Sequence, residues 1–103
     1  MSLTERIGAF NEVLKAKAGF VRGQLDKGNT PSPPQIATFL KQVVTELGAH
    51  VSFVGAAAGD VRSLIEGLGW SVPTNSPTPG SPPPAATAVL AALDACIIAV
   101  AAR

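Results

Sequence analysis

Residues 85–102 read AATAVLAALDACIIAVAA, and this stretch decides the fold. It consists largely of helix-favouring residues, with neither Gly nor Pro to interrupt it, and Asp94 is its only charge. Its larger apolar residues fall near one helical stripe: Val89, Leu90, Leu93, Ile97 and Val100. Because such a helix is apolar nearly all round, it must be covered by the rest of the chain, another copy, another protein or lipid.

The amino-acid composition also indicates that apolar surface must be buried. Of the 103 residues, 47% are hydrophobic and only 15% are charged, whereas globular chains carry about 25% charged residues. The mean hydropathy is +0.32. A chain of this length forms one small domain at most. Its apolar excess therefore favours an oligomer, or a subunit of a larger assembly, over a free monomer.

Residues 1–70 are predicted to be helical, beginning with a helix over about 3–27 that carries apolar residues at helical spacing. Ser32 and Gln35 have the spacing of a capping box, which predicts a second helix over about 33–47. The apolar period then continues over 49–69. Two separate helices and a single helix of about 35 residues both fit this pattern. We favour a helix that continues through, or kinks near, Gly48, because a surface turn usually contains more polar residues.

Residues 71–84, SVPTNSPTPGSPPP, separate this region from a final apolar helix over 85–103. Proline fixes φ and lacks an N–H group, so the segment is predicted to be an extended, semi-rigid spacer, neither helix nor inner strand. Strand signals are poor throughout the sequence. The predicted fold class is all-α: a small bundle or hairpin of three or four helices, with an extended proline-rich segment before the last.

No catalytic, cofactor or metal motif is visible in the sequence. His50 is the only histidine, and with Glu46 it provides too few ligands for a closed zinc site. Cys96 is the only cysteine, and burial in an apolar helix would blunt its reactivity. We therefore predict a non-enzymatic protein without catalytic residues, cofactors or bound metal.

The candidate interface residues include the stripe of the last helix defined above. Trp70 follows a predicted helix end, where it either anchors an interface or packs in the core. Gly55 and Gly59 have G-x-x-x-G spacing, which fits either a close crossing with another helix or a flexible small-residue turn.

The charged residues leave two questions open. Asp94 either lies on a face that stays wet or pairs with a base such as Lys17 or Arg22, or with a neighbouring chain, because burying an unpartnered carboxylate is costly. Lys15, Lys17 and Arg22 resemble a small basic patch for nucleic acid. The net charge of +1 and the acidic residues on the same helix favour a solvated face instead.

Together these features predict a structural or adaptor subunit that self-associates or docks into a larger protein assembly, with a phage or viral virion as one setting. The alternatives are a small protein anchored in a membrane by residues 85–102 and a weak nucleic-acid-binding regulator. Against the membrane anchor, Asp at the centre of a span costs about 2.5–3.5 kcal/mol. The stretch MSLTERIGAF has no apolar signal-peptide core, so we expect the protein to be intracellular when it is made.

Overall fold

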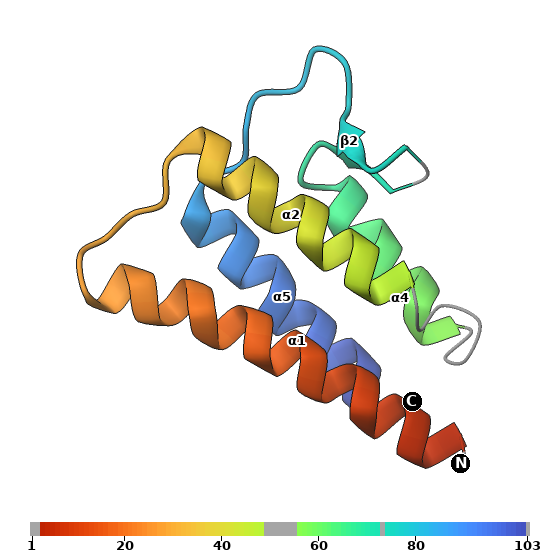
Figure 1. The fold of residues 1–103 in the computed structure, drawn as a ribbon. Helices are drawn as coiled ribbons and strands as arrows, with labels where there is room; N and C mark the ends of the chain where they lie inside the picture. The colour runs from red at the N-terminus through yellow and green to blue at the C-terminus, as the bar shows by residue number, and fades with distance from the viewer. Residues whose placement is uncertain (1–2, 49–55, 73, 103) are drawn as a thin grey trace.

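Four helices make up most of the chain in the computed structural model, which describes residues 3–48, 56–72 and 74–102 (Figure 1). They are α1 (Leu3–Asp26), α2 (Pro33–Gly48), α4 (Ala56–Glu66) and α5 (Ala86–Ala101). A hairpin of two short strands, β1 (Trp70–Ser71) and β2 (Ser76–Pro77), precedes α5. The predicted all-α fold class is confirmed.

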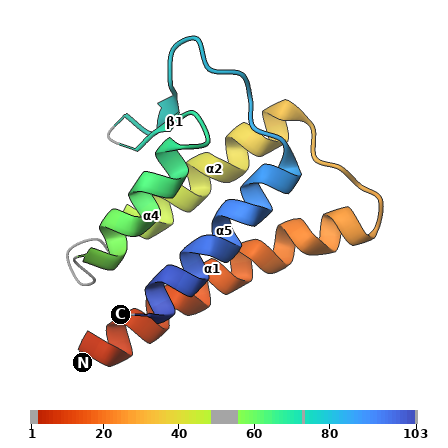
Figure 2. The same cartoon turned by 180° about the vertical axis from the view of Figure 1, so that it is seen from behind.

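The helices alternate in direction along the chain, and α5 lies beside both α1 and α4 (Figures 1 and 2). The backbones of α1 and α5 approach most closely. Both helices carry small residues in the core: Ala18 on α1, and Ala86 and Cys96 on α5. The backbone of α2 stays further from α1, because larger side chains lie between the two helices.

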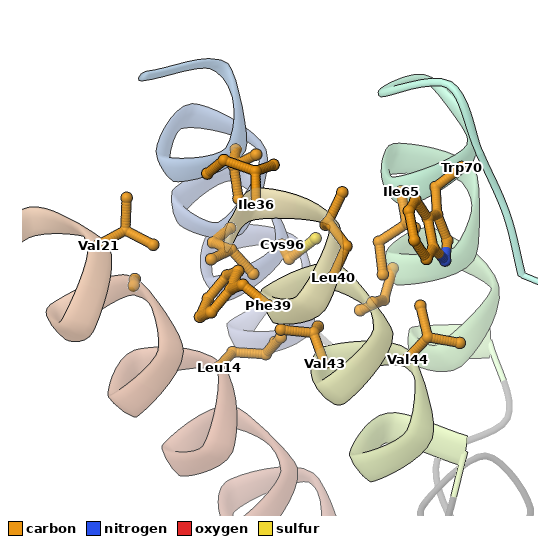
Figure 3. Packing of buried hydrophobic residues seen from close by; sticks show 14 of the residues in the cluster. Leu14, Val21, Ile36, Phe39, Leu40, Val43, Val44, Ile65, Trp70 and Cys96 are labelled. Carbon is orange, nitrogen blue, oxygen red and sulfur yellow. The ribbon is translucent and has the colours of Figure 1, made fainter. Parts of the chain in front are cut away.

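The core forms around α5, whose buried face is covered by the chain itself. That face consists of Ala86, Val89, Leu93, Cys96 and Val100. The other three helices supply the covering side chains, which are Phe10, Leu14, Ala18 and Val21 from α1, Ile36, Phe39, Leu40, Val43 and Val44 from α2, and Val61 and Ile65 from α4. Figure 3 shows Phe39 on the side of α2 toward α1, and Val44 on the side toward Ile65 and Trp70.

The structure differs from the helix that we favoured, which continues through or kinks near Gly48. Helix α2 ends at Gly48, and α4 runs back beside it in the opposite direction (Figures 1 and 2). The predicted continuation covers residues 49–69, of which 49–55 lie outside the described residues. Two antiparallel helices can both direct an apolar face at α5, whereas one straight helix of that length would extend beyond it.

The hairpin was not predicted. In it Trp70 pairs with Pro77 and Ser71 with Ser76, and the Thr78 N–H donates to the Gly69 carbonyl at 2.9 Å. Gly69 has a φ of +84°, and a Cβ there would lie 2.9 Å from the Cβ of Ser81. The close return of the proline-rich chain therefore requires glycine at this position.

Helices α2 and α5 begin in different ways. The Ser32 N–H donates to Oε1 of Gln35 at 2.8 Å, which is the glutamine half of the predicted capping box, and Pro33 begins α2. Helix α5 begins after Ala85 without a side-chain cap. Among the described residues, no helix has the length and apolar content needed to cross a membrane.

Candidate functional site

The predicted interface residues of α5 lie largely within the protein's own core. Val89, Leu93 and Val100 are buried, and Leu90 and Ile97 are partly buried against the same cluster. In this fold they pack on α1, α2 and α4 and do not form an exposed stripe.

Trp70 and the two glycines have different surroundings. Trp70 is buried, and its Nε1 donates to Oδ1 of Asn75 at 3.1 Å. Gly59 is exposed on α4, and a Cβ at this position would meet no atom of the described residues within 4 Å, so none of the described helices crosses closely there. Gly55 lies outside the described residues, as does His50.

The three bases of the suggested patch each have a carboxylate partner. Lys15 Nζ lies 3.5 Å from Glu12 Oε1, and Lys17 Nζ lies 2.6 Å from Glu46 Oε2. Nη2 of Arg22 donates to both carboxylate oxygens of Asp94 at 2.9 Å. Each positive charge thus has a carboxylate close to it.

Asp94 combines the two situations that the sequence left open, since its side chain is half exposed and also paired with Arg22. Cys96, in contrast, is fully buried, and burial raises the pKa of its thiol to about 11. The thiol is therefore protonated at neutral pH, which suppresses its nucleophilicity. Within the described part of the chain, no three His, Cys, Asp or Glu side chains gather as metal ligands would.

A concave surface lies between α1 and α2, and we call it the α1–α2 groove. Its volume is about 730 Å³. Its apolar lining consists of Phe20, Val21, Pro31, Pro34, Ile36 and Phe39. Its polar lining consists of Gln24, Asn29, Thr30, Gln35, Thr38 and Gln42. This size is within the range of about 300–1,000 Å³ that is usual for ligand pockets.

Two stacked aromatic rings line the groove. The ring centroids of Phe20 and Phe39 are 5.8 Å apart, with 15° between the ring planes. Phe39 is buried, whereas 55% of Phe20 is exposed. A large aromatic side chain thus remains accessible in the groove, although it packs on a core residue.

A second hollow of about 420 Å³ continues along the same two helices. It shares Phe20, Phe39 and Gln42 with the α1–α2 groove, and the Lys17–Glu46 ion pair also lines it. Charge therefore appears only in this continuation, because none of the groove's own twelve lining residues is charged.

Sequence reasoning missed Phe20 as a site residue, because it flanks the heptad positions of Leu14 and Val21 and looked like an extension of the buried stripe. The absence of charge from residues 28–40 was an available signal. In comparisons with known proteins, no family model, curated protein or solved structure matches the chain.

Proposed function

We propose that this protein is a non-enzymatic structural subunit that self-associates through the α1–α2 groove. The observation that carries the proposal is Phe20, which is 55% exposed on a groove without charged residues. Large aromatic side chains are enriched at the centres of protein interfaces, where they supply much of the binding energy.

The accessible surface area favours the groove over α5 as the site of association. The accessible surface of the chain is 5654 Å², close to the value of about 5,400 Å² that is typical of a folded monomer of 10.4 kDa. The chain is thus about as compact as a folded monomer, and the predicted apolar stripe of α5 lies in or against its core. An association through the groove would cover an apolar area that remains.

The groove's chemistry favours binding over catalysis. Its lining offers amide, hydroxyl and hydrocarbon groups and no acid or base that titrates near neutral pH. The free thiol of the described chain, on Cys96, is buried in the core. Such a surface is suited to recognising another uncharged surface by shape and hydrogen bonding.

Light scattering of the full chain over a concentration series tests the proposal. We expect the average mass to rise above 10.4 kDa as the concentration approaches about 1 mM, where an association free energy of only about 4 kcal/mol is still detectable. F20Q should stay at the monomer mass over the same range, because it removes the exposed ring but retains good helix propensity.

I98Q is the matched control, because Ile98 is 72% exposed and lies on α5, away from the groove lining. It should associate like the wild type, and circular dichroism should show that both variants remain folded. A wild-type chain that stays monomeric throughout, or an F20Q variant that associates normally, would refute the proposal.

A further inference from the structure

We infer that the occupant of the α1–α2 groove is residues 77–83 of a second copy, a segment that we call the proline arch. The inference rests on the proposed self-association and names the surface that completes it. The arch reads PTPGSPP and links the β-hairpin to α5.

The arch projects from the molecule, where a second copy can reach it. Figures 1 and 2 both show it extending beyond the ends of the helices, between β2 and α5. All of its residues except Ser81 are exposed, and Ser81 is half-buried. Its tip is a β-turn in which the Ser81 N–H donates to the Thr78 carbonyl at 3.1 Å, with Pro79 and Gly80 at the centre. Gly80 has the positive φ, +81°, that a type II turn requires.

Groove and arch match in charge. The groove lining has no charged residue, and the whole stretch 67–93, which includes the arch, has none either. The other exposed surfaces of α1 and α4 carry ion pairs such as Lys15–Glu12 and Arg62–Glu66. Placing those ion pairs in the uncharged groove would remove them from water at a desolvation cost, whereas the arch has no such penalty.

The hydrogen-bonding groups also match. A proline-rich backbone offers carbonyl acceptors but few N–H donors. The amides of Gln24, Gln35 and Gln42 provide side-chain N–H donors along the groove. Phe20 provides the aromatic surface on which proline rings commonly pack in the recognition of proline-rich segments.

The outer face of α5 is the rival occupant, because it is also poor in charge and carries the exposed Ile98. However, Asp94 and its ion pair with Arg22 lie on that helix, one turn before Ile98. Docking this face in the groove would bury part of the ion pair, so the arch fits better.

Groove and arch lie near each other on the molecule. A small apolar hollow, lined by Pro77 and residues 81–84, shares Pro34 and Ile36 of α2 with the groove. Two facing copies can therefore exchange arches reciprocally and close as a two-fold dimer, which limits the mass to twice that of the chain.

One charge on each side of the contact, opposite in sign, tests the inference. Q35E places a negative charge in the groove, and it keeps the acceptor for the Ser32 N–H and suits a helix N-terminus, so the fold should persist. P79K places a positive charge on the exposed tip of the arch, and P79Q is its uncharged control. We expect each charged variant to associate at least tenfold more weakly than the wild type, and P79Q to associate nearly normally.

Mixing the two charged variants gives the decisive result. In the mixed dimer, the groove of P79K and the arch of Q35E form an unaltered contact, and the other contact brings together the two introduced charges, which are opposite in sign. The mixture should therefore regain a dimer by light scattering where each variant alone is monomeric. A wild-type monomer would overturn the proposed function and this inference together. If F20Q and Q35E abolish association but P79K does not, or if the mixture stays monomeric, the groove remains the contact and the arch is excluded. Loss of association in I98Q would indicate α5 instead.

Discussion

Cys96 contributes to stability in a way that depends on pH. Burial, with the negative charge of Asp60 adding to it, raises the pKa of its thiol from 9.0 to about 11. The folded chain therefore holds this proton more tightly than the unfolded chain. The resulting stabilisation of the folded state amounts to about 2–3 kcal/mol. It is complete below pH 9 and is lost as the pH rises from about 9 to 11.

Urea denaturation of wild type and C96A between pH 8 and 11 checks this prediction. C96A lacks the thiol and loses core volume equally at each pH, while all other titrating groups are shared. We expect the stability advantage of the wild type over C96A to shrink steadily above pH 9. An advantage that stays constant across the range would contradict the raised pKa.

The residue patterns indicated which side chains face the core, but they gave less information about which charged side chains form ion pairs. Ala18 is buried in place of Lys17, as helical spacing allowed, and Lys17 turns to Glu46 on α2. Asp94 pairs with Arg22, which lies 72 positions away along the chain. Periodicity within one helix carries no information about which helix lies beside it, so this pair could only be named as one option.

At the scale of elements, the side chain of Asn75 connects the hairpin to α2 by hydrogen bonds. Its Oδ1 accepts the Trp70 indole N–H, and its Nδ2 donates to the Lys41 carbonyl at 3.3 Å and to Thr45 Oγ1 at 3.0 Å. Its backbone has a φ of +50°, which Asn tolerates better than most residues. One side chain thus joins two elements and also supports the turn between the strands.

We expect N75A to lower the unfolding free energy by roughly 2–3 kcal/mol, from lost hydrogen bonds and a strained backbone. N75G, which relieves the backbone but also lacks the side chain, should lose less. Trp70 is the only tryptophan, so its fluorescence should become more solvent-exposed in both variants. Wild-type stability in N75A would show that these hydrogen bonds contribute nothing.

The helices could be predicted because each buries one face over several turns, which leaves a periodic signal. The hairpin could not, because strands of two residues are too short to show alternation. Its signals were Gly69 and Asn75, two residues that accept positive φ, on either side of Trp70. The reversal of direction between α2 and α4 also left no strong polar turn in the sequence.

For the whole molecule, α5 is the element that the others require. A chain ending at residue 84 should lack cooperative unfolding, because the covering faces of α1, α2 and α4 would lose the buried side chains at their centre. Circular dichroism during thermal denaturation should show a broad, shallow transition in place of a sigmoidal one. As a control, the full chain with I98Q should unfold cooperatively, and a sigmoidal transition in the truncated chain would contradict this role of α5.

The α1–α2 groove illustrates what sequence reasoning could not supply. It exists because α2 stands further from α1 than α5 does, with Phe20 and Phe39 stacked between the two helices. Helix spacing depends on the side chains of both partners at once. The sequence indicated an apolar excess, and it placed that excess on α5, whereas the fold buries one face of α5 and leaves Phe20 and Ile98 exposed.

The close packing of α1 against α5 has a consequence for biosynthesis. Ribosomes add about 5–20 residues per second, so a residue of α1 such as Arg22 waits roughly 4–14 s before its partner Asp94, 72 positions later, has been made. During that interval the face of α1 that packs against α5 in the folded protein has no permanent neighbour. Nascent chains of this protein should therefore be clients of holding chaperones until the last helix emerges.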